Sequence, residues 1–317
     1  MANREIIAGV ETYALYAEES TYGTSPGTID QPFGLIQDFK VKENAGHITS
    51  YGFVGSSSGG RKPASIIAGK FEGTVTIDLQ PQDMGFLKYV LGAVSGAGTV
   101  ASPFAYTVGS TVPSVTVSSN HNNVTTDREN QYLGVVFATM TLRCSVGEAL
   151  TCTLEGMYGD VTKDSTISSN QALSTNSPFT FVGGSIEIPN ASAISNIIDS
   201  VELTVSNNSE VFYGIGSRTS KQGIAKKLAL SMKFTVKELD ETIIDTFRGS
   251  SSAVGSTQTA DATVALRFDD GSNHYVDIIL TNGKIADWGN NESLHELVTE
   301  DLTYSAEDIT INVVTQA

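Results

Sequence analysis

The chain has 317 residues, of which 40% are hydrophobic and only 17% are charged. This length suits two domains of about 150 residues, and the abundance of Ser, Thr, Asn and Gly disfavours coiled coils and helical bundles. The 19 basic and 35 acidic residues give a formal net charge of −16, which excludes a general binder of nucleic acid or anionic membranes but leaves room for a local basic patch.

Targeting and redox signals are weak. No stretch reaches the roughly 18 consecutive apolar residues of a membrane span. Residues 1–9 contain only a short apolar run and do not resemble a signal peptide, so we expect synthesis in the cytosol unless another system exports the chain. Cys144 and Cys152 are too few for a disulfide framework, and they flank a predicted turn either as buried free thiols or as a cross-strand disulfide.

The first half predicts short strands, one short helix and one long loop. Val75, Ile77 and Leu79 alternate with polar residues, which indicates a strand with one buried face. In the next segment Asp83 can cap a helix that carries the apolar stripe Met84, Leu87 and Leu91 and stops at Gly92. The remaining predicted elements are an arm over 1–30, a strand over 33–41, a polar Gly/Ser-rich loop over 42–69 and a hairpin over 132–158.

After a polar linker over 161–177 the same order returns. The strand at 35–41 resembles 197–203, and Met232, Phe234 and Val236 repeat the alternation of the first half. A second helix follows, with Ile243, Ile244 and Phe247 on its stripe and Gly249 at its end, and the half closes with a hairpin near 273–304. A repeat of about 157 residues predicts a duplicated α+β domain, with chance similarity between simple β patterns as the alternative.

Several letter patterns suggest chemistry without its context. Gly55-Ser-Ser-Ser-Gly59 spells a nucleophile elbow, but it lies among turn formers and not between a strand and a helix. The histidines His47, His121, His274 and His295 are isolated from one another and from the cysteines, and 269–273 favours a hairpin turn over a calcium loop. The sequence therefore predicts no enzyme, no metal site and no cofactor.

An ordered set of segments resembles the phage tail tube proteins. It comprises the opening Glu18 to Gly27, the strand-to-helix unit Gly73 to Gly92, the hairpin Thr141 to Gly156, and the runs 178–188 and 201–210. The resemblance implies a mainly β (α+β) protein with two tandem tube-like β-sandwich or barrel domains, at 1–165 and 166–317. Each domain would have a short flanking helix and a long loop that reaches the next ring.

The resemblance also implies an assembly. Subunits would join their sheets into stacked rings that form the tube through which DNA leaves the virion. Three two-domain chains would complete a ring with pseudo-six-fold symmetry, and a hexamer is the alternative. The implied partners are other copies of the chain, other tail proteins and double-stranded DNA in transit without sequence-specific binding. No membrane is involved, and the chain would be made in the host cytoplasm and end in the virion tail.

The two long loops are the predicted contacts between rings. Ordering a long polar loop costs conformational entropy, and contact with a neighbouring subunit would offset that cost. We expect 44–66 and 206–226 to make these contacts, with apolar anchors and with basic residues that pair with acidic ones: Phe53, Phe212 and Tyr213, and Arg61, Lys62, Arg218 and Lys221. An acidic or neutral bore would let DNA pass, because attraction to phosphate would hold it in place.

One function of another class stays open. The same strand-rich pattern fits an exported β-sandwich adhesion or binding module of a virion or cell surface. Such a module would be a monomer that binds a ligand, whereas a tube subunit would polymerise.

Overall fold

The computed structural model describes residues 12–50, 65–121, 128–164, 174–187, 198–237, 245, 247–250, 253–255, 262–270, 273–292, 294 and 298–315. Strands make up 63% of it and one short α-helix is present, so the prediction of a mainly β fold is confirmed. Within the described ranges, no helix is long and apolar enough to cross a bilayer.

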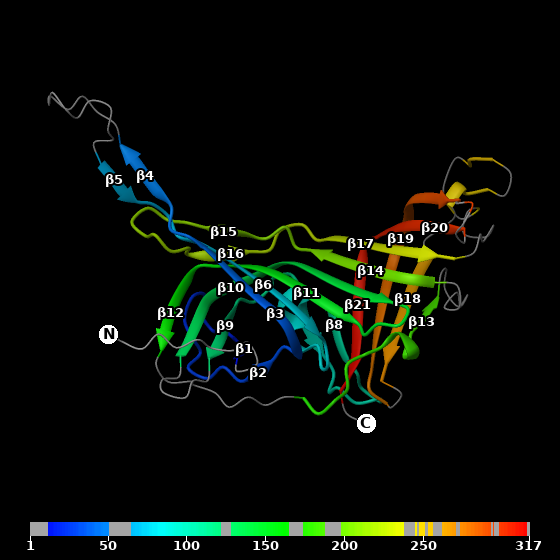
Figure 1. The fold of residues 1–317 in the computed structure, drawn as a ribbon, viewed down its shortest axis with the longest axis horizontal. Helices are drawn as coiled ribbons and strands as arrows, with labels where there is room; N and C mark the ends of the chain where they lie inside the picture. The colour runs from blue at the N-terminus through cyan, green and yellow to red at the C-terminus, as the bar shows by residue number, and fades with distance from the viewer. Residues whose placement is uncertain are drawn as a thin grey trace.

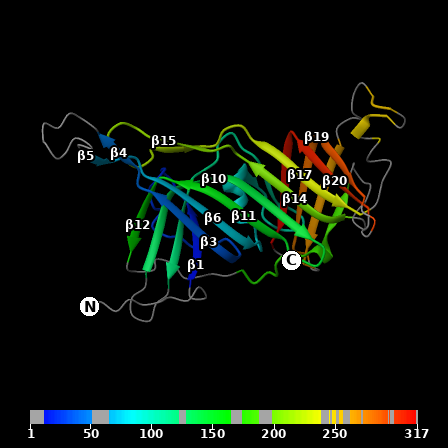
Figure 2. The same cartoon turned by 45° about the horizontal axis from the view of Figure 1, so that its top comes forward.

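One antiparallel sheet of eight strands, here called the long sheet, runs through both halves of the chain (Figure 1). Figure 2 shows most of these strands side by side in the same succession. Their order is β3 (Leu35–Asn44), β6 (Glu72–Gln80), β11 (Thr151–Tyr158), β10 (Arg128–Ser145), β14 (Ile198–Ser206), β17 (Ala229–Val236), β20 (Thr299–Ala306) and β19 (Tyr275–Asn291).

Two smaller antiparallel sheets pack beneath the long sheet, and the second combines strands of both halves. The first has the order β2 (Gln31–Pro32), β1 (Thr12–Glu18), β9 (Val115–His121), β10 and β12 (Asp160–Asp164). The second has the order β13 (Ser185–Glu187), β18 (Ala262–Asp269), β19, β21 (Asp308–Val314), β8 (Phe104–Val108) and β7 (Gly92–Ser95). The long strands β10 and β19 bend at bulges and so belong to two sheets each.

No path through these pairings returns to the strand where it began. The strands wrap around a shared core, but among the described residues no barrel closes, so of the predicted sandwich or barrel domains the barrel form is not confirmed. Two-stranded ribbons extend from the body: β4 (His47–Ser50) with β5 (Ser65–Ala68), and β15 (Glu210–Phe212) with β16 (Gln222–Ile224).

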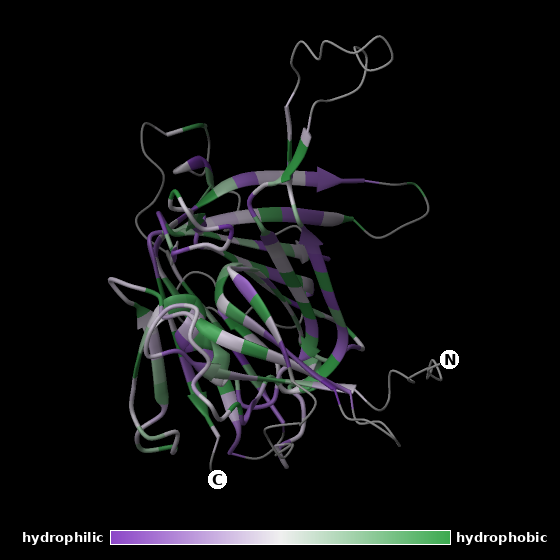
Figure 3. Cartoon of the chain, turned by 90° about the vertical axis from the view of Figure 1, so that its left-hand side faces the viewer, coloured by the Kyte–Doolittle hydropathy of each residue, from purple (hydrophilic) through white to green (hydrophobic). Residues whose placement is uncertain are grey.

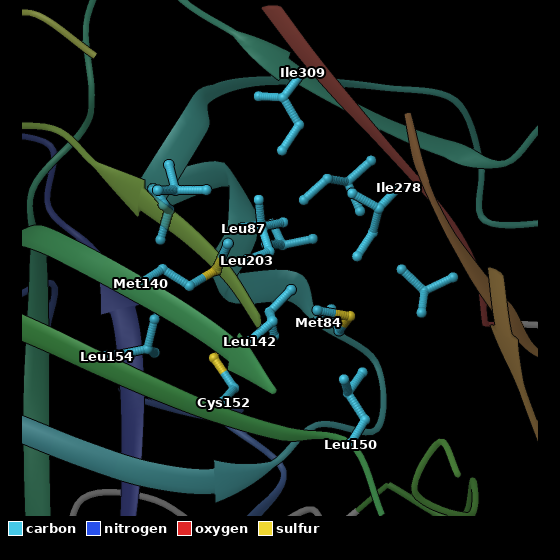
Figure 4. Close-up of a cluster of buried hydrophobic side chains, with 14 of the residues drawn as sticks. Met84, Leu87, Met140, Leu142, Leu150, Cys152, Leu154, Leu203, Ile278 and Ile309 are labelled. Carbon is cyan, nitrogen blue, oxygen red and sulfur yellow. The ribbon is translucent and has the colours of Figure 1, made fainter. Parts of the chain in front are cut away.

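The core lies between the long sheet and the small sheets and is continuous across both halves. Figure 4 shows Met140 and Leu142 of the first half facing Ile278 and Ile309 of the second, with Met84 and Leu87 between them. Figure 3 shows the alternation of polar and apolar residues along the strands that gives each sheet one buried face. The predicted alternation at Val75, Ile77 and Leu79 is confirmed, since all three are buried.

The predicted helix is present but shorter than expected. It consists of a 3-10 turn, η2 (Gly85–Leu87), and one α turn, α1 (Lys88–Leu91), followed by Gly92 at φ 103. Asp83 does not cap it, because Met84 precedes the turn in the left-handed conformation and the Asp83 carboxylate instead accepts a bond from Asn176 Nδ2 at 2.7 Å. Of the second predicted helix, Asp245, Phe247 and Arg248 are helical, and 238–244 lies outside the described residues.

The hairpin predicted over 132–158 is formed by β10 and β11. Cys144 and Cys152 are buried free thiols that do not face each other, because Cys152 lies opposite Leu142 and Cys144 lies opposite Val201. Burial raises the pKa of the Cys144 thiol to about 11 and raises that of Cys152 as well. The alternative of a cross-strand disulfide does not hold.

Part of the strand pairing recurs in both halves, with some of its irregularities. In β3 the register to β6 shifts between Ile36 and Asp38, and in β14 the register to β17 shifts between Ile198 and Ser200. The register shift at Phe137/Thr139 between β10 and β11 recurs at Ile285/Asp287 between β19 and β20. The shift at Tyr132/Val135 between β10 and β9 recurs at Ala262/Val264 between β18 and β19. Asp160 and Asp308 each accept the backbone N–H of the next residue at 2.8 Å.

Candidate assembly interface

The long sheet ends in two strands that have a neighbour on one side only. Within the described ranges, β3 pairs with β6 alone, and residues 284–291 of β19 pair with β20 alone. Every other strand of this sheet lies between two neighbours. Unpaired N–H and C=O groups along an edge form a template for another strand.

A strand pairing at the centre of the sheet joins the two halves. This internal seam has seven residue pairs between β10 and β14, from Thr139 opposite Ser206 to Ser145 opposite Ser200. Arg143 Nε donates to Glu202 Oε2 at 2.6 Å across it on the polar face. On the core side, Met140, Leu142 and Cys144 face apolar residues of β14 and are buried.

Asn207 fixes one end of the internal seam. Its buried side-chain amide donates to the carbonyl of Val90 at 2.8 Å and to that of Phe137 at 3.3 Å, so it ties the short helix and the β10 bulge of the first half to the second half. Its backbone N–H donates to Ala138 O at 2.8 Å. A buried amide with satisfied bonds specifies the register of the strands around it.

A groove borders each of the two equivalent strands β14 and β3. The groove beside β14 is lined in part by Cys144, Ser145 and Val146 from the end of β10, where Val146 N donates to Asp199 O at 3.0 Å. Among the described residues, the groove beside β3 is lined by β1, β3 and β9, including Tyr13, Ile36 and Phe39, and it is the larger of the two. The open strand therefore borders the larger groove.

The second long loop lies against the first half of its own chain. Tyr213 Oη donates to Phe71 O at 2.7 Å, Arg218 Nε donates to Gly69 O at 2.9 Å, and Phe71 N donates to Arg218 O at 2.8 Å. Tyr22 and Ser220 share a hydroxyl–hydroxyl bond of 2.6 Å, and burial raises the pKa of Tyr22. These contacts hold the β15–β16 ribbon at the base of the first arm.

The first long loop leaves the body as the β4–β5 ribbon, which Figure 1 shows projecting away from the sheets. Three of its apolar side chains are exposed, Ile48, Ile66 and Ile67. An isolated two-stranded ribbon is marginally stable in water, so these side chains suit contact with another molecule. The anchors Phe53, Arg61 and Lys62 lie at 51–64, outside the described residues.

The other predicted contact residues divide into two kinds. Tyr213 and Arg218 bind the base of the first arm within the chain. Phe212 and Lys221 are exposed, and Lys221 N donates to Phe212 O at 2.7 Å within the β15–β16 ribbon. The inter-ring role of all seven residues stays a prediction.

Sequence reasoning did not find the strand edges, because periodicity reports which face of a strand is buried and not which strand lies next to it.

The outer face of the long sheet is polar and nearly balanced in charge. Lys40 pairs there with Asp38, and Thr153 donates to Asp78 at 2.7 Å. Apart from these groups the face carries mainly Thr and Ser side chains. The register puts seven carboxylates and five cations on it, which are Asp38, Glu72, Asp78, Glu155, Glu202, Asp287 and Asp301, and Lys40, Lys42, Arg143, Lys233 and Lys284.

The described residues contain no group of three or more His, Cys, Asp and Glu side chains placed to hold a metal ion. His274 is buried, and its two ring nitrogens contact Asp270 Oδ2 at 3.1 Å and Gln82 O at 2.7 Å, so it ties loops together. Glu19 is also buried and accepts four bonds from loops and strands of the first half. These polar groups have structural partners.

Comparison with known proteins identifies the family of the chain. No curated protein matches the chain. The family model described as phage tail tube protein matches residues 9–313, nearly the whole chain. The chain therefore belongs to the phage tail tube protein family, whose members are structural proteins of the bacteriophage virion.

Proposed function

We propose that the chain is a tail tube subunit made of two copies of one tube domain, at 1–165 and 166–317, and that three chains close a ring around the path of DNA. One observation carries the proposal: β10 of the first half pairs with β14 of the second, while the equivalent strands β19 and β3 are the open edges. A further copy can extend the sheet at each edge in the way the halves extend it internally.

The size of the resulting sheet favours three chains. Three times eight strands gives 24, and at a spacing of about 4.8 Å and a tilt of about 40° a 24-stranded cylinder has a backbone diameter of about 48 Å. When the space taken by the inward-facing side chains is subtracted, this bore is still wider than a DNA duplex. Six chains would double the diameter, which leaves the duplex unsupported, so the trimer with pseudo-six-fold symmetry is the better assembly.

The polar face of the long sheet is the proposed lining of the bore. Its seven carboxylates outnumber its five cations, and two of these cations, Lys40 and Arg143, are each paired to a carboxylate. Free cations would bind phosphates and retard the DNA, whereas hydroxyl groups and paired charges do not. This composition suits passage of double-stranded DNA without sequence-specific binding during ejection.

The projecting ribbon is the proposed contact between stacked rings. The exposed Ile48, Ile66 and Ile67 would pack on the next ring, with Phe53, Arg61 and Lys62 in the same arm. Phe212 and Lys221 would contribute from the second loop, while Tyr213 and Arg218 would hold the base of the first arm. Other tail proteins would cap the stack at its ends, and the assembled tube would reside in the virion tail.

Microscopy and mass measurement test this function. We expect concentrated purified protein to form rings or tubes in negative stain, and native mass spectrometry of isolated single rings to find three chains of 33.5 kDa each. Rings of six chains would overturn the trimer. A chain that stays monomeric at every concentration and salt, and that binds a glycan, would instead support an adhesion module.

A further inference from the structure

We infer that β19 of one chain pairs with β3 of the next in the register of the internal seam, and that Leu294 of the first chain enters the groove beside β3 of the second. This external seam rests on the proposed function, because it is the contact that would join chains within a ring. It adds which residues meet and in which order. The inference depends on positions that correspond between the two halves.

The correspondence between β10 and β19 follows from their hairpin partners. Leu142 lies opposite Cys152 in the first hairpin, and Asn290 lies opposite Glu300 in the second, so each pair encloses the same length of chain. The bulges Phe137/Thr139 and Ile285/Asp287 fall at the same distance before these pairs. Position 142 therefore corresponds to 290, and the same offset applies along both strands.

The correspondence between β3 and β14 follows from β6 and β17. Val41 lies opposite Val75, and Leu203 lies opposite Met232, where Val75 and Met232 are equivalent by sequence. Ile36 and Ile198 lie just before the matching register shifts. Position 203 of β14 therefore corresponds to position 41 of β3.

These two correspondences convert the internal seam into a set of predicted pairs. Leu142 opposite Leu203 becomes Asn290 opposite Val41, and Arg143 opposite Glu202 becomes Asn291 opposite Lys40. The set of pairs between one chain and the next is Asp287 with Asn44, Trp288 with Glu43, Gly289 with Lys42, Asn290 with Val41, Asn291 with Lys40 and Glu292 with Phe39.

Leu294 is the predicted occupant of the groove beside β3. It corresponds to Val146, which follows β10, lines the groove beside β14 and donates its N–H to Asp199 O. Leu294 is 94% exposed in the single chain, and the equivalent acceptor is Gln37 in the wall of the open groove. A nearly fully exposed leucine and a groove that is larger than its counterpart in the chain, with Tyr13, Ile36 and Phe39 in its walls, are compatible surfaces.

Opposite charges on the two edges support the same register. Asp287 and Lys42 are both exposed on the polar face of their edges. In the predicted register Asp287 lies opposite Asn44, and Lys42 is its diagonal neighbour on the same face. Opposite charges at this spacing attract across antiparallel strands. A register displaced by two residues so that Asn291 lies opposite Lys42 would move Asp287 away from Lys42.

Paired cysteines test the register directly. The variant Lys40→Cys with Asn291→Cys places one thiol on each edge of the chain, directly opposite in the predicted seam. The off-register variant Lys42→Cys with Asn291→Cys is displaced by two residues on the same face. Arg143→Cys with Glu202→Cys is the matched control, because these positions are opposite within one chain. The parent chain has only the buried Cys144 and Cys152.

Assembled protein is oxidised with copper phenanthroline and run on a non-reducing gel. We expect covalent trimers from the 40/291 variant at least tenfold faster than from the 42/291 variant, a bridge within the monomer from the 143/202 control, and no product from the parent. Tubes that cross-link faster through 42/291, or through neither pair, would overturn the external seam alone. A parent that never assembles would overturn the proposed function and the seam together.

Leu294→Ser tests the groove without cysteines. Since Leu294 is almost fully exposed, the single chain should keep its thermal midpoint, while ring formation should need at least tenfold more protein. Val254→Ser is the matched control, because Val254 is 83% exposed and no part of the predicted seam. Equal assembly by the two variants would overturn the role of Leu294.

Discussion

Strands β14 and β3 occupy equivalent places in the two halves and differ in what lies beside them. Both carry a register shift near their first residues, and both contribute apolar side chains to the core. β14 pairs with β10 on the side away from β17, and its Leu203 is buried. Among the described residues β3 has no neighbour on the corresponding side, and its Val41 is half-buried. The difference teaches that one strand pattern can complete the fold of a subunit or present an edge to the next subunit.

The largest effect expected in the single chain comes from the buried member of this pair. Leu203→Ala should lower the free energy of unfolding by about 2–5 kcal/mol, because it removes buried methyl groups and leaves a cavity in the core. The equivalent Val41→Ala should cost about 1 kcal/mol or less, since its site is half open. Urea unfolding of monomeric protein measures both, and equal losses would contradict the distinction between the two edges.

The next effect concerns the small sheet of the first half. Glu19 Oε2 accepts from Gly23 N at 2.9 Å, and Oε1 accepts from Gly134 N at 2.7 Å. In Glu19→Gln, either orientation of the amide turns its NH₂ toward one of these backbone donors. We expect a loss of about 1–3 kcal/mol for the unsatisfied group, measured by urea unfolding.

The conservative Glu19→Asp variant separates geometry from charge for this carboxylate. It keeps the charge and shortens the reach, so it should also be destabilised. A Gln variant as stable as the parent would show that the carboxylate does not hold β1 and β9 against the β10 loop.

Alkaline pH should weaken the internal seam more than the open edge. Cys144 lies in that seam, and burial raises the pKa of its thiol from 9.0 to about 11. The equivalent position at the open edge is the exposed Glu292. Between pH 9.0 and about pH 11 the unfolded chain loses the proton of the Cys144 thiol and the folded chain keeps it, so the free energy of unfolding falls as pH rises.

Thermal midpoints at pH 8 and pH 10.5 check this prediction. Buried tyrosines such as Tyr106 and Tyr132, with pKa values raised to about 12, add to the same trend. Cys144→Ala should therefore show a smaller fall than the parent over this range. An identical fall in both proteins would remove Cys144 as a cause.

The smallest effect belongs to the ion pair of the internal seam. Arg143 and Glu202 are partly exposed, so Arg143→Ala should cost about 0.2–1 kcal/mol. Their contribution should shrink as salt is added, because solvent screens exposed charges. Equal destabilisation at low and high salt would indicate lost packing of the arginine stem instead of lost charge.

Much of the fold could be predicted from local pattern. Alternation located β6 and β17, and turn residues located the β10–β11 hairpin. The capping role of Asp83 was wrong, because Met84 is left-handed and the Asp83 carboxylate instead accepts a bond from Asn176, which is distant in sequence. The strand neighbours, the unequal grooves and the in-chain bonds of Tyr213 and Arg218 are likewise long-range, and no spacing of residue types specifies them.

The pairing of β10 with β14 has a consequence for the kinetics of polymerisation. A ring of six separate domains would require six encounters between molecules, whereas in a ring of three such chains every second contact already exists when the chain has folded. Covalent linkage gives these contacts an effective concentration in the millimolar range and removes their share of lost translational entropy. Growth of the polymer would then be limited by half as many collisions, and each arriving unit would bring a completed junction with it.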